Sequence, residues 1–371
     1  LVLLLEITFF NPRIGGAKAG ICFDHQNPKA IEVMRRFLKA HKELLMQEFS
    51  TGADLNTCNS VIQKIMQDDL NMESSFVSIS KMFTRKMGIE ACSQLISSRI
   101  GHPITRGFTL EEGAVGYSIA TCIATLCAKK PRVLIQGFGQ VGSGAAHFLE
   151  SLHLADVVGV CEVDGFIYHP HGIHIEKLFF SKKNQARQTF LLSQCLTPQE
   201  REYYHFSPRG EKENDEELLC RFLCSQQAEV FSPCAARYQI TENVAKTLLK
   251  STFYNLTEKC LIISGANNVY SSEDVRLYLS DGKVELVPEW VSNCGMALLF
   301  FESLKVEDIG LCWEKTALAS INDAVSSFLL RAKKMNASNQ ETLFTNCHNL
   351  AAPHLPSFSP QFPRRLGHCG L

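Results

Sequence analysis

The sequence contains no long apolar run, no surplus of charge of either sign and no regular cysteine spacing. The apolar opening LVLLLEITFF covers only residues 1–10 and includes Glu6, so it is too short to span a bilayer. It also lacks the basic start and the cleavage site of a signal peptide. We predict a buried strand there. Because the chain starts at Leu1, directly in sequence typical of a core, we expect a segment before it to be missing.

The charge balance excludes several classes of partner. Lys and Arg total 37 against 38 Asp and Glu, which gives a net charge of -1 and no basic run for nucleic acid or anionic lipid. We therefore predict small-molecule partners and a homo-oligomer, with no nucleic acid and no membrane. The 15 cysteines in 371 residues form no disulfide framework. A reduced, cytoplasmic protein is predicted, and the mitochondrial matrix stays open because the start is missing.

What the sequence does contain, after Pro131, is a repeated order of strand, turn and helix. Five short apolar runs without polar alternation are predicted strands: 132–137, 156–161, 229–235, 260–266 and 284–290. Such runs are typical of a parallel sheet that is buried on both faces. The predicted fold class is α/β, with two domains around a cleft and a Rossmann-type, doubly wound, mainly parallel sheet in the second.

The predicted domain limits follow changes in pattern along the chain. Residues 1–109 form a partial substrate and dimerisation domain that 294–335 complete, residues 110–293 form the dinucleotide domain, and 336–371 form a disordered tail. Apolar residues at helical spacing predict one helix from Asn27 to Met46. A second helix starts at Thr109, where Glu112 three residues later completes a capping box.

The segment RVLIQGFGQVGSGAAHFLE predicts a phosphate-binding loop between a strand and a helix. Gly137 makes the tight turn, Gly139 lets the backbone approach a pyrophosphate and Gly142 lets the helix pack on the strand; Gln140 and Val141 complete the loop. A second strand ends at Glu162, whose carboxylate suits both hydroxyls of an adenine ribose. It repels a 2'-phosphate, which favours NAD while NADP stays open, and Asp164 is a competing carboxylate. A glycine-rich turn without a ligand is the alternative.

Two further loops carry a lysine and an aspartate among small residues. In GGAKAG, Lys18 is either a solvated lysine in a tight turn or a lysine aimed into a pocket. In TGADLNT, Asp54 is either a helix cap or a catalytic carboxylate, and spacing alone favours neither. Asn267, in GANN after a predicted strand, is a turn residue or a ligand contact.

From Ile14 to Glu302 the chain resembles the glutamate, leucine, phenylalanine and valine dehydrogenases. The similarity rests on GGAKAG, TGADLNT, GFGQVG, VGVCEVDGFIYHPHGI, SPCAA, GANNVYSSEDV and PEWVSNCGMALLFFE, in the order of the family. The resemblance implies NAD-linked oxidative deamination of an L-amino acid to a 2-oxo acid and ammonia. It implies that Lys18 activates water, that Asp54 shuttles protons and that Asn267 lies beside the nicotinamide ribose.

The sequence departs from the family pattern at three places. The lysines that bind substrate carboxylates in the family lie upstream of the catalytic lysine, and the chain before Leu1 is not given. Val115 stands where a threonine is common, and Glu111 stands where an arginine is often found. Leu299 and Phe300 occupy positions near a serine of glutamate-specific members, so an apolar wall for an aliphatic or aromatic substrate is predicted, with glutamate left open.

Other patterns are assigned no chemistry. His169, His171 and His174 are interrupted by Pro and Gly, which favours a surface turn, and no metal is predicted. Cys220 and Cys224 lie on one face of a predicted helix. The rival to an active enzyme is a non-catalytic dinucleotide-binding homologue, and a different oxidoreductase on the same sheet is a third hypothesis.

Overall fold

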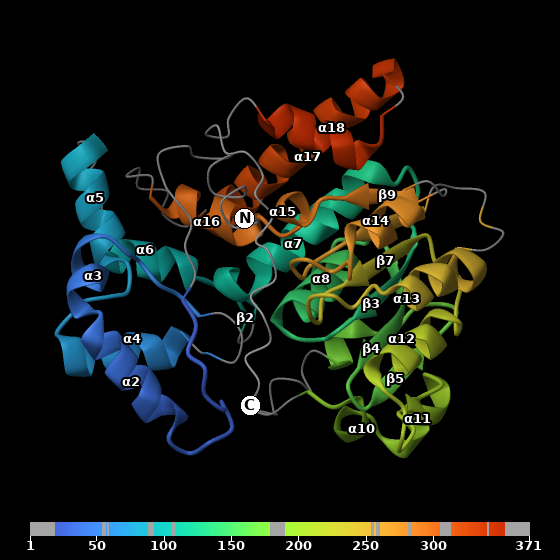
Figure 1. Ribbon diagram of the computed structural model, residues 1–371, viewed down its shortest axis with the longest axis horizontal. Helices are drawn as coiled ribbons and strands as arrows, with labels where there is room; N and C mark the ends of the chain where they lie inside the picture. The colour runs from blue at the N-terminus through green and yellow to red at the C-terminus, as the bar shows by residue number, and fades with distance from the viewer. Residues whose placement is uncertain are drawn as a thin grey trace.

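The computed structural model describes residues 19–53, 57, 59–87, 93–105, 108–178, 190–253, 256, 260–280, 284–304, 313–339 and 341–352. The predicted opening strand, Lys18 and Asp54 lie outside these described residues. Figure 1 shows helices α2 to α6 on one side and a sheet covered by helices on the other, with α17 and α18 at the top.

The N-terminal helices build a small core of their own. These helices are α2 (Ala30–Ala40), α3 (Lys42–Gln47), α4 (Asn59–Leu70), α5 (Val77–Met87) and α6 (Ser93–Ile100). The single helix predicted from Asn27 to Met46 is wrong, because it breaks at His41 into α2 and α3. The turn at His41 brings Leu38 and Leu45 into the same apolar cluster as Met66 of α4. Burial of this cluster therefore overrides the continuous helical spacing of the sequence.

Helix α7 (Leu110–Leu126) begins at the predicted residue and passes through the middle of the molecule. A short hairpin, β1 (Pro103–Thr105) with β2 (Phe108–Thr109), precedes it. The Thr109 side chain accepts a hydrogen bond from the Glu112 backbone N–H, and the Glu112 carboxylate accepts one from the Thr109 N–H at 3.0 Å, which confirms the capping box. Small residues let α7 cross α8 (Gln140–Ser151) closely: a methyl group added at Gly116 would collide with the Gly144 backbone.

The sheet has seven strands in the order β6-β5-β4-β3-β7-β8-β9. All five predicted strands are present, as β3 (Arg132–Gln136), β4 (Asp156–Glu162), β7 (Val230–Pro233), β8 (Cys260–Ile263) and β9 (Val284–Val287). Every pair of neighbours among them is parallel. The predicted fold class is confirmed, because the strand order runs in opposite directions from β3 and so defines a doubly wound sheet.

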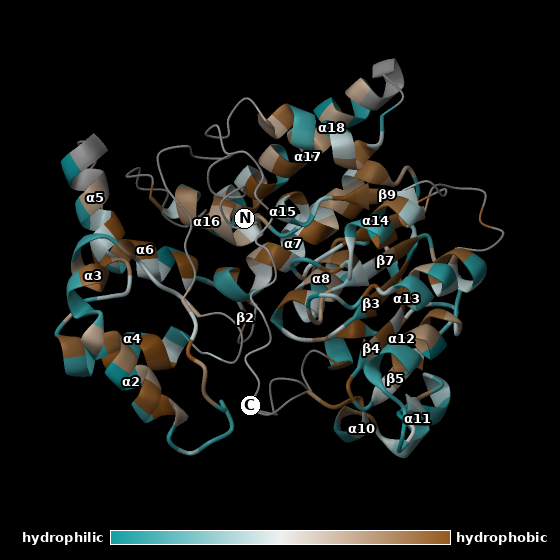
Figure 2. Ribbon diagram, in the orientation of Figure 1, coloured by the Kyte–Doolittle hydropathy of each residue, from teal (hydrophilic) through white to brown (hydrophobic). Residues whose placement is uncertain are grey.

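Helices cover each face of the sheet. In Figure 2 the strands between these helices are brown, the colour of hydrophobic residues. Val133 and Ile135 of β3 pack in the large core shared with α7 and α8. Leu134 points to the opposite face, where the core is shared with α12 (Asp215–Leu223), α13 (Glu242–Thr247), the π-helical turn Leu248–Thr252 and α14 (Glu273–Ser280). Successive side chains of β3 thus point to opposite faces of the sheet, and both faces are apolar. The strand therefore shows no alternation of polar and apolar residues.

The antiparallel edge of the sheet was not predicted from the sequence. β5 (Gly165–Tyr168) pairs with β4, and β6 (Ser207–Pro208) pairs with β5, both antiparallel. The chain between them forms α10 (Leu192–Cys195) and α11 (Pro198–Tyr203). Gly165 has a φ of 146°, so the turn after β4 uses a conformation open to glycine. The four-residue β5 and two-residue β6 are too short to give a recognisable period.

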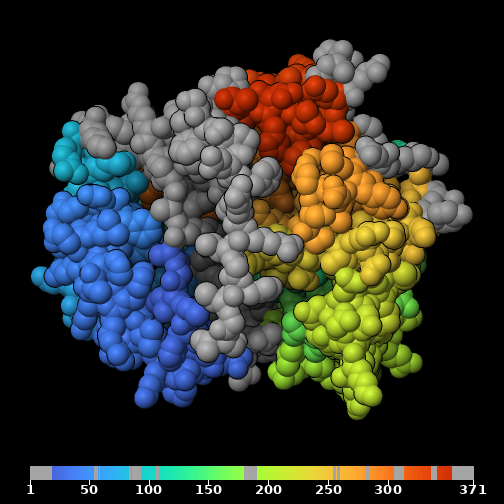
Figure 3. All heavy atoms as spheres, viewed as in Figure 1, coloured from blue at the N-terminus to red at the C-terminus, as the bar shows by residue number. Residues whose placement is uncertain are grey.

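The C-terminal helices return over α7. They are α15 (Glu289–Ser292), α16 (Gly295–Ser303), α17 (Trp313–Asn339) and α18 (Leu343–Ala351). The predicted disordered tail from residue 336 is therefore wrong as far as Ala351, and residues 353–371 lie outside the described chain. Thr342 caps α18, whose Leu343 and Cys347 are buried in the large core at helical spacing. Figure 3 shows the N-terminal helices in blue apart from the sheet region in green to orange. Within the described chain, no helix is both long and apolar enough to cross a membrane.

Candidate functional site

The predicted phosphate loop lies where the strand order reverses, between β3 and β7. Gly137 has a φ of 85°, and a methyl group added there would lie 2.8 Å from the Ala235 Cα. The Cys234 N–H donates to the Gln136 carbonyl at 2.8 Å, so the loops after both strands are joined. In open α/β sheets this point is the usual place of a ligand. The tight turn assigned to Gly137 is therefore present.

The start of α8 leaves its backbone amides open to an anion. Gly139 is the N-cap residue, no side chain caps the helix and no acidic residue lies in its first turn. A methyl group at Gly139 would meet nothing within 4 Å, whereas one at Gly142 would collide with the Gly137 carbonyl oxygen. Gly142 thus permits strand–helix packing and Gly139 leaves the approach free. Exposed amides and the helix dipole together suit a phosphate group.

Glu162 is the carboxylate that faces the loop. It accepts a short hydrogen bond from the Phe138 N–H and another from the Val163 N–H at 3.3 Å. Asp164, the competing carboxylate, instead accepts from the Leu192 N–H at 3.1 Å and the Ser193 N–H at 2.8 Å and so caps α10. The Glu162 carboxylate therefore lies at the start of the phosphate loop, whereas that of Asp164 is held at the start of α10. The structure thereby separates the two candidates.

Asn267 lies on the loop after β8, opposite the link into the C-terminal helices. Its Oδ1 accepts a hydrogen bond from the Asn293 Nδ2. Asn293 is 8% exposed and follows α15, where the Ser292 hydroxyl donates to the Ser264 carbonyl at 2.6 Å. The asparagine pair therefore joins the carboxyl edge of the sheet to α15. Asn267 was predicted from the sequence and Asn293 was not, although Asn293 lies three residues after the end of a predicted strand.

Two buried polar atoms beside this edge have no partner in the described chain. They are the Gln136 Oε1 and the Ser264 Oγ, at the ends of β3 and β8. The Gln136 amide nitrogen donates to Gln239 at 2.9 Å, which fixes the side chain. Unpartnered buried acceptors are rare in folded proteins. A dinucleotide placed across this edge has polar groups that could satisfy them.

The remaining loop residues hold α8 against its neighbours. The Gln140 Nε2 donates to the Glu111 carbonyl oxygen at 3.4 Å, which places the start of α7 beside the start of α8. Val141 packs beside Gly265 of the β8 loop. The Glu111 carboxyl is half-buried, and burial, with Glu112 nearby, raises its pKa to about 7. The burial of this carboxyl was not predicted from the sequence, because no local pattern indicates it.

The two residues predicted to meet the substrate differ in exposure. Leu299 is fully buried in the large core, so its side chain offers no surface to a ligand in this structure. Phe300 is half-buried and its ring lies 5.7 Å from that of Phe76, before α5. A contact with substrate therefore stays a prediction for Phe300, whereas Leu299 is a core residue.

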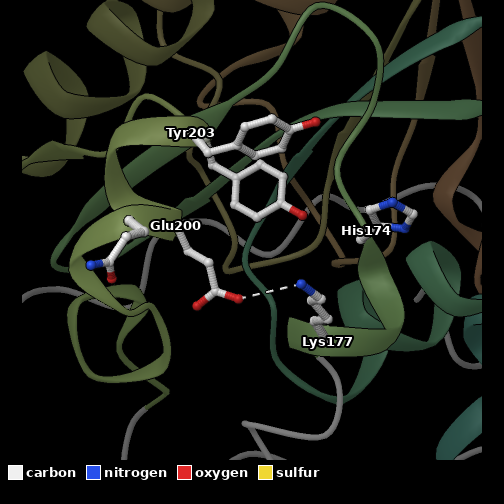
Figure 4. Close-up of a pocket in the computed structure, with 6 residues that line it drawn as sticks. His174, Lys177, Glu200 and Tyr203 are labelled. Atoms are coloured by element: carbon white, nitrogen blue, oxygen red, sulfur yellow. Dashed lines mark ion pairs between the residues drawn. The ribbon is translucent and has the colours of Figure 1, made fainter.

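A separate pocket of about 340 Å³ lies near the antiparallel edge of the sheet (Figure 4). It is lined by His174, Lys177, Gln199, Glu200, Tyr203 and Tyr204. Lys177 and Glu200 form an ion pair of 3.6 Å within it, and no predicted site residue lines it. His169 stacks on Tyr203 with ring centres 4.6 Å apart. Among the described residues, no group of His, Cys, Asp and Glu could hold a metal ion.

The fold and the loop together define a doubly wound α/β protein with a glycine-rich loop of the dinucleotide-binding type between β3 and α8. The family model for Glutamate/Leucine/Phenylalanine/Valine dehydrogenase matches residues 107–327. The chain belongs to this family. The match includes the phosphate loop, Glu162, Asn267 and the start of α16, so the resemblance seen in the sequence is confirmed over the sheet and its flanking helices.

Similar proteins span more sequence than this chain. The cryptic catabolic NAD-specific glutamate dehydrogenase of Bacillus subtilis is 24% identical over 312 residues, which cover 81% of this chain and 61% of the relative. The NAD-specific glutamate dehydrogenase of Staphylococcus aureus is 22% identical over 315 residues, covering 80% and 63%. The chain thus spans less than two thirds of the length of these relatives.

Solved structures share the fold at low identity. A hetero-hexameric glutamate dehydrogenase from Thermus thermophilus, in its Leu-bound form, superposes with a TM-score of 0.65 at 18% identity, covering 95% of this chain and 74% of that one. Glutamate dehydrogenase from Plasmodium falciparum gives 0.62 at 13% identity, covering 95% and 70%.

Proposed function

We propose that the chain is an NAD-dependent amino-acid dehydrogenase that converts an L-amino acid reversibly to a 2-oxo acid and ammonia. The observation that carries the proposal is the phosphate loop, in which the open start of α8 lies beside the Glu162 carboxylate. Membership of the family and relatives named as NAD-specific enzymes support it. Substrates from glutamate to leucine, valine and phenylalanine are consistent with that family.

The residues of this chain would hold the cofactor in a defined way. The α8 amides would bind the pyrophosphate, Glu162 the adenine ribose and Asn267 the nicotinamide ribose. The carboxylate of Glu162 disfavours a 2'-phosphate, which is why NAD is proposed over NADP. When bound, NAD supplies the acceptor for the hydride of the substrate α-carbon.

Acid–base chemistry is assigned to Lys18 and Asp54 by the family resemblance. A lysine in a confined site has a lowered pKa, so it is suited to orient and activate water at the imine carbon. A carboxylate such as Asp54 is suited to move protons to and from the amine. Both residues lie outside the described chain, so these roles are tested by substitution.

We also propose that the protein self-associates and acts in the cytoplasm. The similar Thermus thermophilus structure is described as hetero-hexameric, which supports an oligomer. The curated relatives reported above come from bacteria and lend no support to the mitochondrial alternative. Sedimentation as a monomer at micromolar concentration would contradict self-association.

Lys18→Ala separates an enzyme from a non-catalytic homologue. We expect the substitution to abolish NAD reduction with any amino acid that the wild type oxidises, while NADH affinity stays within twofold. Lys29→Ala, an exposed lysine before α2, is the matched control and should leave turnover unchanged. Unchanged turnover in Lys18→Ala removes the lysine from the mechanism. No turnover by the wild type, with NADH still bound, favours the non-catalytic homologue.

A further inference from the structure

The helical phase of α7 assigns each of its faces to a different neighbour. Gly116 lies against Gly144 of α8, and Gly113 faces Phe148 of the same helix. Ser118 donates to the Ser292 carbonyl at 2.7 Å and accepts from the Gly295 N–H at 3.3 Å, so its face lies against α15 and α16. These contacts fix the orientation of the whole helix.

Glu111 lies on the face toward α15 and α16. At roughly 100° per residue, Glu111 is about 20° from Ser118 and about 40° from Val115 around the helix axis. By the same geometry it is about 140° from Gly116, on the side away from α8. Its side chain therefore points away from the helix that would hold the phosphates.

The level of Glu111 along the helix places it near the start of α16. A methyl group at Gly295 would collide with the Ala114 carbonyl oxygen, so α16 begins one turn of α7 from Glu111. On the other flank, Ile119 lies against Gly265 of the β8 loop, two residues before Asn267. Glu111 and Val115 thus occupy the arc of α7 between the start of α16 and the loop of Asn267.

No cation balances Glu111 among the described residues. The ion pairs of that part of the chain do not include it, and the charge acting on it is that of Glu112 on the same helix. Glu112 itself is held in the capping box with Thr109. Burial raises the pKa of Glu111 to about 7, so the carboxyl is largely ionised at the alkaline pH of a deamination assay. A second carboxylate brought beside it meets like-charge repulsion.

We infer that Glu111 is a specificity residue that disfavours amino acids whose side chain ends in a carboxylate. This inference rests on the proposed function and names its substrate class: amino acids with an uncharged side chain. It sets this chain apart from the relatives named as glutamate dehydrogenases. Val115, one turn along α7 from Glu111, adds apolar surface to the same arc of the helix.

Glutamate and glutamine test the inference, because they differ in charge and little in shape. We expect the wild type to give a higher kcat/KM with glutamine than with glutamate at pH 8. Glu111→Gln should raise the ratio of kcat/KM for glutamate over glutamine at least tenfold, and Glu111→Arg should raise it further. A ratio that stays within twofold in both variants, or a wild type that prefers glutamate, overturns the inference.

Glu112→Gln is the matched control. It removes one negative charge from the neighbouring position, and glutamine preserves the capping box through its amide oxygen. We expect its glutamate-to-glutamine ratio to stay within twofold of the wild type. An effect as large as that of Glu111→Gln would show that net charge at the helix start decides, and would overturn the assignment to Glu111.

Ligand binding gives the same comparison without turnover. Calorimetric titration of the NADH-loaded protein with valerate and with glutarate measures the effect of one added carboxylate. We expect valerate to bind the wild type more tightly than glutarate does. The ratio of the glutarate Kd to the valerate Kd should fall at least tenfold in Glu111→Gln. An unchanged ratio of the two Kd values in Glu111→Gln overturns the inference about Glu111 and leaves the proposed function standing. Absence of turnover with any amino acid counts against the proposed function, and failure of both acids to bind overturns both.

Discussion

Helices α7 and α8 start side by side at the carboxyl edge of the sheet, yet they begin in opposite ways. α8 begins with Gly139, without a capping side chain or an acidic residue. α7 begins with the Thr109–Glu112 capping box and carries Glu111 in its first turn. Open amides attract an anion, whereas satisfied amides with added carboxylates repel one. The difference divides the edge into a place for phosphates and a place that disfavours negative charge.

The largest effect is expected from closing the open start of α8. Gly142→Ala has no room for its methyl group beside the Gly137 carbonyl. Overpacking of this kind costs about 1–3 kcal/mol, occasionally more, and moves the loop. We expect loss of measurable NADH binding by fluorescence titration and a lower melting temperature. The methyl group of Gly139→Ala meets nothing within 4 Å, so this variant should keep the melting temperature of the wild type. The same methyl group stands in the approach to the α8 amides, so it should lower NADH affinity at least tenfold. Equal thermal stability of both variants would contradict the assigned packing.

The next effect concerns the carboxylate that faces the loop. Glu162→Gln loses ionic acceptors for ribose hydroxyls and the repulsion of a 2'-phosphate. We expect NADH affinity to fall about tenfold, the equivalent of roughly 1.4 kcal/mol, and the NADPH-to-NADH preference to rise. Asp164→Asn is the control, because Asp164 caps α10 and should affect stability alone. A cofactor preference that follows Asp164 would reverse the assignment.

A smaller effect is expected from opening the start of α7. Thr109→Ala removes the side chain that caps the helix and should lower the free energy of unfolding by about 1 kcal/mol. Urea denaturation measures the loss. NADH affinity should stay within twofold, because the phosphates are assigned to α8. A large loss of NADH affinity would mean that α7 also contributes amides to the dinucleotide.

An effect similar in size to that of Thr109→Ala is expected in the pH dependence of stability through Glu111. Its pKa rises from 4.5 to about 7 in the folded chain, so folding favours the protonated carboxyl. The stabilisation is complete below pH 4.5 and is lost as the pH rises through 7. Wild type and Glu111→Gln should therefore diverge from pH 5 to pH 8, with the variant gaining on the order of 1 kcal/mol.

Urea denaturation of both proteins at each pH measures this divergence. His348, whose pKa is lowered by burial, acts in the opposite direction but is common to both proteins and cancels in the difference. A difference between the two proteins that is independent of pH would contradict the raised pKa of Glu111.

The sequence predicted the sheet well and the surroundings of the site less well. Strands β3 and β8 are recognisable because both faces are buried, so β8 and the three central residues of β3 are apolar without interruption. The phosphate loop was predictable because its glycines stand where the local backbone conformation or the local packing requires a residue without a side chain. In contrast, the division of roles between Glu162 and Asp164 depends on α10, which lies far along the chain. The break at His41 and the order of α18 likewise depend on tertiary burial, which no local pattern records.

The central claim is that this edge of the sheet supports amino-acid oxidation with NAD. The most direct measurement supplies NAD with glutamate, glutamine, leucine, valine or phenylalanine and records NADH and ammonia together. We predict equal amounts of NADH and ammonia, with glutamate among the poorest of the five substrates. Tight NADH binding without formation of either product from any of them would contradict an amino-acid dehydrogenase.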